Sequence, residues 1–487
     1  MRTLYYNWVD YLDDEGRGGG VSVYQANLLR RLEETPGVEA VFLSSGLAYD
    51  LRNRTPRWEP LRHGPGSKTP RFEIVNSGCL SPSHHSFGND TQVAHPETEL
   101  VFSDFLQAQG PFDVVHFNNL EGVPANVLAL RATFPDTRFV LSLHNYYPVC
   151  PQVNLWFGER ENCLDFEGGS RCIGCLEHKP AENLTQTANG LAYWMKVHGI
   201  RAGTWQFDLL YRSIIRAGSL ASRIVGRMRQ RAPVLSNGGT VDKAQGFVDR
   251  RAAMVRLINE NCDRVLAVSD RVGEIAVAHG IDQDLVRTSY IGSAQAEKFA
   301  QSVPRGAVPG SDGTVTLGYL GYMRRDKGFF FLLDALEKLP KDIASRVRLL
   351  VAAKIWPDSS MARLDALKTH LAGVTHVNGY GHGDLDDLLA RVDVGLIPVM
   401  WQDNLPQVAI EMHARHIPLL TSDLGGAQEL GRCPDMVFQA SSTQSFTDRL
   451  RFLLDGKFDP DRYWQGAMAP ISMDAHVRQL LEVYRAV

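Results

Sequence analysis

Long apolar runs are missing from this chain of 487 residues. No stretch approaches the roughly 20 apolar residues that a helix needs to cross a bilayer. The first residues, 1–7, resemble a β-strand and lack the apolar core of a signal peptide. We therefore expect a cytoplasmic protein.

Excess charge of either sign is also missing. The formal net charge is −4 at pH 7, and nothing in the overall balance indicates a surface for nucleic acid, so no nucleic-acid partner is expected. The Gly-x-Gly-x-x-Gly spacing of dinucleotide-binding proteins is absent as well.

Cysteine is present in an odd number, seven, and four of the seven are clustered. In a reducing compartment this favours metal binding over disulfide bonds. The scattered Cys79, Cys262 and Cys433 are expected to be buried apolar residues.

The chain is longer than one hydrophobic core usually supports, so two or three domains are expected. Strand-like runs alternate with helical patterns, which predicts parallel α/β layers. In the first half, strands are expected at 3–9, 39–45, 113–118, 139–144 and 264–269. In the second half, they are expected at 315–321, 348–353, 375–378, 394–398, 418–422 and 436–439.

Three segments stand out from this alternation of strand-like and helical runs. Residues 303–313 are rich in Pro and Gly and predict an interdomain linker. Residues 48–96 show little apolar periodicity and predict a long loop or insertion. Residues 464–487 contain a helical pattern at the end of the chain.

A glycine-rich loop at 16–20 follows the first predicted strand and opens a helix. Glycines let the backbone approach a ligand, and a helix start favours negative charge. A plain turn is the alternative. The apolar positions of the helix are expected to include Val23, Leu28, Leu29 and Leu32.

The most informative stretch is 401–411, which follows the buried strand predicted at 394–398. Pro406 suits a first helical turn, and Asn404 is a candidate cap. Asp403 then lies in the loop, and Glu411 lies more than a turn inside the helix. Free backbone amides at this helix start suit a phosphate.

Other candidate residues follow predicted strands. Lys327 lies in the basic loop 320–328, after the first strand of the second half. His144 ends a strand of the first half, and Asn118 and Asn119 follow another. Ligands bind at the carboxyl ends of the strands in such sheets.

Taken together, these motifs resemble family 4 glycosyltransferases, in particular a bacterial subset with a Cys-rich insertion in the N-terminal domain. The resemblance rests on Asp403 and Glu411 with Asn and Pro between them, on the loop 421–429, and on Lys327 followed by Gly. It implies an α/β protein of the GT-B fold, with two doubly wound Rossmann-like domains facing a central cleft.

The same resemblance implies the domain limits. An N-terminal acceptor domain would span 1–305 and include the Cys-rich insertion at about 148–180 and a basic amphipathic segment at about 190–232. A C-terminal nucleotide-sugar donor domain would span 314–465. The helix at 466–487 would cross back to the N-terminal domain.

The resemblance also assigns roles. Catalytic roles would fall to Asp403, Glu411 and His144, and Asn118 and Asn119 would bind the acceptor. The donor would be held by a larger set from both domains, namely Gly19, Gly20, Arg324, Arg325, Lys327, Asn404, Leu405, Pro406, Gln407, Val408, Glu411, Gly425, Gly426 and Glu429.

The implied reaction is transfer of a sugar from a nucleotide-diphosphate donor to a glycan or lipid-linked acceptor, with retained anomeric configuration and without a catalytic metal. Two residues depart from the family pattern. Tyr322 stands where an Arg is usual. Asp403 stands where a Glu is usual, and its side chain is shorter than that of Glu by one methylene. A nucleotide-sugar epimerase of the same fold and a non-catalytic nucleotide-sugar-binding protein are the alternatives.

The clustered cysteines are Cys150, Cys163, Cys172 and Cys175. Four thiolates match a tetrahedral structural Zn²⁺ site, with His178 as a substitute ligand. The intervening sequence has little core of its own, so a metal could supply its folding energy. Free thiols, a disulfide and an iron–sulfur cluster are the alternatives.

The basic segment from Lys196 to Arg231 carries eight cations against the single acid Asp208, together with Trp and aliphatic residues. This pattern is typical of contact with an anionic lipid surface, at the inner face of the plasma membrane. A solvated helix packed on the first domain and a groove for a charged glycan are the alternatives.

Overall fold

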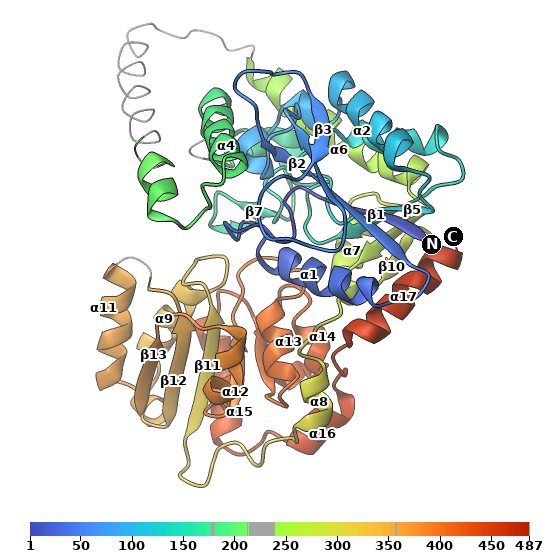
Figure 1. Ribbon diagram of the computed structural model, residues 1–487. Helices are drawn as coiled ribbons and strands as arrows, with labels where there is room; N and C mark the ends of the chain where they lie inside the picture. Colours follow the sequence, from blue (N-terminus) through green and yellow to red (C-terminus); the bar gives the residue numbers. More distant parts are fainter. Residues whose placement is uncertain (177–180, 212, 214–238, 356–357, 487) are drawn as a thin grey trace, which may run out of the picture.

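The structure is a computed structural model that describes residues 1–487, except 177–180, 212, 214–238, 356–357 and 487. Its strands form two large sheets, one in each half of the chain, and a two-stranded ribbon. The two halves stack with the carboxyl ends of their strands facing each other (Figure 1). Among the described residues, no helix is both long and apolar enough to span a membrane.

The first sheet has eight strands in the order β10-β9-β6-β5-β1-β2-β4-β3, and only β3 runs antiparallel to its neighbour. Its strands are β1 (Arg2–Asn7), β2 (Glu39–Ala48), β3 (Arg57–Pro60), β4 (Arg71–Val75), β5 (Val114–Phe117), β6 (Arg138–Leu143), β9 (Arg264–Ala267) and β10 (Val286–Thr288). The ribbon is made of β7 (Trp156–Phe157) and β8 (Glu161–Asn162).

The second sheet has six parallel strands in the order β13-β12-β11-β14-β15-β16. They are β11 (Val315–Gly321), β12 (Val347–Ala353), β13 (Gly373–Val377), β14 (Val394–Ile397), β15 (Leu419–Ser422) and β16 (Val437–Phe438). Each of the eleven predicted strands corresponds to one observed strand, within a few residues at its ends.

The predicted loop at 48–96 is wrong in part, because it contains β3 and β4. Both strands are short, and β4 reads Arg-Phe-Glu-Ile-Val. The Glu73 carboxyl group of β4 is nevertheless buried, beside His63. A charged residue at an inward position masks the alternation by which a strand is recognised.

Helices cover the sheets of both domains (Figure 1). Those of the first half are α1 (Gly19–Glu33), α2 (Pro96–Gln109), α3 (Ser170–Ile173), α4 (Glu182–Val197), α6 (Gly239–Asn261) and α7 (Asp270–Ala278). Those that follow are α8 (Glu297–Gln301), α9 (Phe329–Glu337), α10 (Lys341–Ala344), α11 (Asp358–Ala366), α12 (Leu385–Leu389), α13 (Gln407–His413), α14 (Gln428–Gly431), α15 (Thr443–Leu454), α16 (Pro460–Gly466) and α17 (Met473–Ala486).

The chain passes between the domains at two adjacent places. Ser293 donates its backbone N–H to the carbonyl of Ile471. The segment that leaves the first domain and the segment that returns to it therefore run side by side. Helix α8 follows the first crossing and packs on the second domain, where Phe299 stacks on His416. Residues 297–301, which the predicted domain limit at 305 assigns to the first domain, therefore pack with the second.

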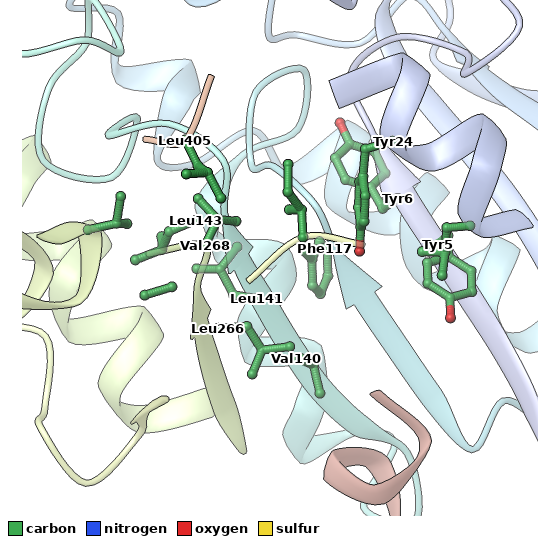
Figure 2. Close-up of a cluster of buried hydrophobic side chains, with 14 of the residues drawn as sticks. Tyr5, Tyr6, Tyr24, Phe117, Val140, Leu141, Leu143, Leu266, Val268 and Leu405 are labelled. Atoms are coloured by element: carbon green, nitrogen blue, oxygen red, sulfur yellow. The ribbon is translucent and has the colours of Figure 1, made fainter. Parts of the chain in front are cut away.

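Buried apolar side chains join the two domains. Leu405, from the loop after β14, belongs to the same buried cluster as Leu143 at the end of β6 and Val268 after β9. Figure 2 shows these three side chains together with Tyr6 and Phe117 of the first sheet. The core of the first domain thus extends across the interface at the base of the cleft.

Helix α17 returns to the first domain, where it lies along α1 (Figure 1). Its Tyr484 hydroxyl hydrogen-bonds Tyr5 and the imidazole of His116. One turn from its start, His476 shares a 2.7 Å hydrogen bond with the Tyr24 hydroxyl of α1. Polar contacts inside the core therefore fix how the last helix is seated.

The buried His476 makes the stability of this arrangement depend on pH. Burial lowers the pKa of His476 to about 4 from an ordinary value of 6.5. The neutral ring is therefore stabilising above pH 6.5, and this contribution is lost as pH falls toward 4, because the unfolded chain binds a proton that the folded chain does not. Between pH 7.5 and 5, we expect wild type to lose about 2 kcal/mol more unfolding free energy than His476→Gln. Urea unfolding at the two pH values measures this difference, and equal losses in both proteins would contradict it.

Candidate functional site

A cavity of about 830 Å³ lies between the two domains. Its walls come from the glycine loop and α1 on one side, and from the loops after β11, β12, β13 and β14 on the other. In the second sheet, β11 lies between β12 and β14, so the connections leave it in opposite directions there. Open α/β sheets bind ligands at such a switch point, outside the carboxyl ends of their strands.

The predicted glycine loop lies on the first-domain wall of this cavity. Gly19 has a positive φ of 54° and faces open space, and Gly20 faces Gln407 of the second domain. The helix prediction needs one correction. Val23 was expected on the apolar face of α1, but it is 37% exposed and lines the cavity, whereas Leu28, Leu29 and Leu32 are buried.

The loop after β11 is held tightly against the end of β14. Gly328, at φ 74°, approaches the Pro398 carbonyl so closely that an added Cβ would lie 1.6 Å from the oxygen. Only glycine combines this backbone conformation with this contact. The preceding residue, Lys327, is thereby directed into the cavity from a rigid turn.

Lys327 and Asp403 form an ion pair inside the cavity. The ammonium Nζ lies 2.6 Å from the Asp403 carboxylate and 5.3 Å from the centre of the Trp401 ring. The Asp403 side chain is only 9% exposed, and that of Lys327 is 29% exposed. The two groups predicted to hold different parts of a ligand therefore neutralise each other in this structure.

The other two basic residues of the loop point elsewhere. The Arg324 Nε donates to the Asp326 carboxylate at 3.0 Å, and its side chain is 54% exposed. Arg325 lies over the ring of Phe330. Neither lines the cavity, so this geometry leaves Lys327 as the cation of the loop that a ligand there would meet.

Helix α13 begins at Gln407, with Pro406 in the N-cap position. The prediction that Asn404 caps this helix is wrong. Its side-chain amide instead donates to the carbonyl of Leu143 in the first domain, at 3.3 Å. Glu411 is the fifth residue of the helix, is buried, and lines the cavity together with 404–408.

The loop 423–429 lies behind the cavity wall rather than on it. Gly425, at φ 73°, packs against the backbone of Asp403, and the Gly426 N–H donates to the Asp403 carbonyl at 2.9 Å. The Glu429 carboxylate accepts the backbone N–H groups of Asp270 and Arg271, at the start of α7. These residues support the Asp403 loop and join the domains, and this geometry gives no support to their predicted contact with a donor.

His144 follows β6 and reaches the cavity from the first domain. Its Nε2 lies 3.3 Å from Asn118 Oδ1, and its ring lies 5.1 Å from that of Tyr24. Burial and, to a smaller extent, the nearby His476 lower the pKa of His144 to about 3. The ring is neutral at physiological pH and can offer a hydrogen bond but no charge.

Asn118 and Asn119 are buried beneath the cavity and do not line it. Asn119 donates to the Glu121 carboxylate, which also accepts from Asn145, the residue after His144. Burial raises the pKa of Glu121. In this structure Asn118 contacts His144 directly, and Asn119 contacts Glu121, the partner of the neighbouring Asn145. The prediction that the two asparagines bind an acceptor remains untested.

Two residues that line the cavity, Lys354 and Tyr380, were not among the predicted site residues. Lys354 and Tyr380 line the wall formed by the second domain, directly after β12 and close after β13. Both were detectable from their positions near the ends of predicted strands. Glu121, which is buried and does not line the cavity, was detectable in the same way, two residues after Asn119.

The four clustered cysteines surround one small cavity of about 10 Å³, beside Arg171 and Arg251. Burial raises the pKa of Cys172 to about 12 and that of Cys175 to about 11. All four residues are described, and no three of their sulfur atoms lie within 4.8 Å of one another. The four cysteines line one cavity, but their sulfur atoms are too far apart here to bind one ion, so zinc binding remains a prediction; His178 lies outside the described residues.

Only part of the predicted basic segment is described. Lys196 was expected to face a lipid surface, but it is buried and pairs with Asp13, Asp14 and Glu15, just before the glycine loop. In residues 205–211, Trp205, Leu209 and Leu210 are exposed. The remaining predicted cations, except the exposed Arg201, lie outside the described residues, so membrane contact remains a prediction.

Comparisons with known proteins address the class of the chain. Residues 314–456 match the family described as "Glycosyl transferases group 1". A Klebsiella pneumoniae protein described as an uncharacterized 42.6 kDa protein in the cps region is 29% identical over 243 residues. That match covers 49% of this chain and 59% of the relative, so the chain spans just over half the length of the curated protein it matches.

Solved structures share the fold over the whole chain. Anabaena HepE in complex with UDP has a TM-score of 0.54 at 12% identity, with all of both chains covered. Sucrose-phosphate synthase from Thermosynechococcus elongatus gives 0.55 at 13% identity, covering 100% of this chain and 98% of that one. An α,α-trehalose-phosphate synthase (UDP-forming) from Burkholderia vietnamiensis gives 0.52 at 13% identity, with both chains fully covered.

The resemblance to glycosyltransferases is therefore confirmed, and so is the GT-B fold of two Rossmann-like domains. The second domain carries the sequence pattern of group 1 glycosyltransferases. Membership of family 4 and of its Cys-rich subset is not tested by these matches.

Proposed function

We propose that this protein is a retaining glycosyltransferase that takes a sugar from a nucleoside-diphosphate sugar. The observation that carries the proposal is the cavity at the switch point of the second sheet, which Lys327, Asp403 and Glu411 line together with His144 of the first domain. The match of the second domain to group 1 glycosyltransferases supports it.

We assign the parts of the donor to these residues from their positions in the cavity. The diphosphate contacts Lys327 and the backbone amides at the start of α13, where a helix favours negative charge. Glu411 lies further along α13 and holds the ribose. As the sugar–phosphate bond breaks, negative charge develops on the leaving diphosphate, and Lys327 stabilises it.

Donor binding releases Asp403 for the sugar. In this structure the carboxylate pairs with Lys327. An incoming diphosphate competes for the ammonium, so the carboxylate is freed to accept hydrogen bonds from sugar hydroxyls. The neutral His144 offers a hydrogen bond to the sugar from the opposite wall. The leaving phosphate, rather than a protein base, then takes the acceptor proton, and the anomeric configuration is retained.

The acceptor is proposed to be a glycan or a lipid-linked sugar of a bacterial polysaccharide. The similarity to a Klebsiella pneumoniae protein in a cps region supports this setting. The exposed Trp205, Leu209 and Leu210 offer apolar surface on the first domain, as a lipid-linked acceptor would require.

Incubation with UDP-, GDP-, ADP- and dTDP-sugars tests the proposal. Release of nucleoside diphosphate, or transfer to an added glycan, is the expected result with one donor class. An isomerised nucleotide sugar would identify an epimerase instead. Tight binding without any product would identify a non-catalytic binding protein.

Replacing Lys327 should weaken nucleotide binding. We expect Lys327→Met to reduce the affinity for the preferred nucleoside diphosphate by about 10-fold or more, the effect of losing one charge-assisted contact. Arg324→Met is the matched control, because Arg324 lies in the same loop, pairs with Asp326 and does not line the cavity. Isothermal titration calorimetry measures both, and equal losses would contradict the assignment.

Replacing Asp403 should have the opposite effect on nucleotide binding. Asp403→Asn removes the carboxylate that competes for Lys327, so free nucleoside diphosphate should bind several-fold more tightly. Sugar transfer should fall at least 10-fold, because the sugar loses an acceptor of hydrogen bonds. Calorimetry and a steady-state assay on the same preparation separate the two effects. Weaker binding of nucleoside diphosphate would show that the ion pair organises the site rather than blocking it.

We also propose that the four clustered cysteines bind a structural Zn²⁺. Their shared cavity of about 10 Å³ is the size of one small occupant, and Arg171 and Arg251 offset the charge of thiolates. The sulfur atoms would have to move closer together, because tetrahedral zinc holds its ligands about 2.3 Å from the metal. The Zn²⁺ would displace the thiol protons that burial otherwise retains.

Metal analysis tests this assignment. Protein purified without chelator should contain about one zinc per chain, and Cys172→Ser should lose the metal and unfold at a lower temperature. Cys433→Ser should retain the metal, since Cys433 lies away from that cavity. Zinc-free wild type with reactive thiols would exclude the site.

A further inference from the structure

Three neighbouring strand ends carry side chains for which the proposed chemistry has no role. Tyr322 follows β11, Lys354 follows β12, and Tyr380 lies close after β13. All three line the cavity, on the side away from β14. Since adjacent strands lie about 4.8 Å apart, Tyr380 is some 14 Å along the sheet from the strand that leads to Asp403.

The aliphatic part of the Lys354 side chain packs against Gly379. At Gly379, which has a positive φ of 78°, an added Cβ would lie 3.1 Å from Lys354 Cγ, closer than an ordinary contact, and 3.7 Å from its Cε. The Ile355 N–H donates to the side chain of Asn378 at 2.9 Å, which fixes the loops after β12 and β13 to each other. The Lys354 side chain therefore has a defined direction along the wall of the cavity.

The Lys354 ammonium differs from that of Lys327 in its surroundings. Lys327 is engaged by Asp403, whereas no ion pair found among the described residues includes Lys354. An ammonium offers three donors and no acceptor, so it seeks oxygen or ring-nitrogen acceptors on a ligand.

Tyr380 lies near Glu411, the residue that we assign to the ribose, and lines the same cavity as Lys354. Burial raises the pKa of Tyr380, and the nearby Glu411 carboxylate and Tyr322 raise it further. Its hydroxyl therefore stays protonated, close to the helix residue that we assign to the ribose. A nucleoside whose ribose contacts Glu411 and whose phosphates contact Lys327 would extend its base toward these three residues.

We propose that Tyr322, Lys354 and Tyr380 form the nucleobase subsite, and that Lys354 selects a base with a carbonyl oxygen where cytosine or adenine carries an amino group. The proposal rests on the proposed function and adds the class of nucleotide to it. An amino group would place donor against donor at the ammonium, whereas O4 of uracil or O6 of guanine accepts. The replacement of the usual Arg by Tyr322 then fits a contact with the nucleoside rather than with phosphate.

Two nucleotide pairs test this selection, because UDP differs from CDP, and GDP from ADP, in the presence of this carbonyl group. Affinities of wild type are measured by calorimetry for all four nucleotides. Within the pair that binds, the carbonyl base should bind about tenfold more tightly. Lys354→Met keeps the stem over Gly379, removes the ammonium, and should bring the ratio close to one. Lys354→Arg keeps the donors and should retain the preference.

The outcomes that overturn the proposal are distinct from those that overturn the function. Equal weakening of all four nucleotides by Lys354→Met would make Lys354 a phosphate contact. An unchanged ratio in that variant, or a wild-type preference for the amino base, would remove Lys354 from base selection. Each of these leaves the glycosyltransferase intact. Failure of wild type to bind any of these four nucleotides or dTDP would overturn the proposed function and this subsite together.

Discussion

The contact between the loop after β14 and the end of β6 is the constraint on which the cleft depends. Asn404 bonds the Leu143 carbonyl, and Leu405 enters the core of the first domain beside Leu143 and Val268 (Figure 2). Leu143 immediately precedes His144, and Asn404 immediately follows Asp403. One patch of packing therefore sets the position of a cavity residue on each wall. Changes at this patch would displace both walls at once.

Other contacts stabilise the same closed arrangement from further away. Glu429 of the second domain accepts two backbone N–H groups at the start of α7, where an acidic group is favourable. Helix α17 seats His476 and Tyr484 in the core of the first domain. Separating the domains would break these two hydrogen bonds, so they favour the observed arrangement.

Inside the cleft, Lys327 and Asp403 neutralise each other. A buried carboxylate without a partner would be costly, and the partly exposed Lys327 ammonium is that partner for Asp403. This explains why a cation and an acid with different proposed roles lie 2.6 Å apart. Under the proposed function, the affinity for a donor is therefore set by the contacts that the donor makes with Lys327 and Asp403, less the ion pair that it replaces.

The sequence predicted the second domain best. Most of its strands, such as β14 and β15, are apolar runs bounded by turn residues, and the resulting loops placed Lys327, Asp403 and Glu411 in one cavity. Side-chain direction was harder to predict. Arg324 and Arg325 are within three residues of Lys327 but point out of the cavity, because Asp326 and Phe330 engage them. Glu429 could not be assigned from the sequence, since its partners are 158 and 159 residues away. Lys196 was misread for the same reason, because its partners Asp13–Glu15 lie in a distant loop.

A crystal structure with the preferred nucleoside-diphosphate sugar tests the account most directly. It should show the diphosphate against Lys327 with the Asp403 pair broken, the ribose against Glu411, and the sugar between Asp403 and His144. A nucleotide seated elsewhere, such as the open pocket between Arg432 and Arg449, would contradict it, as would a donor bound with the Lys327–Asp403 pair intact.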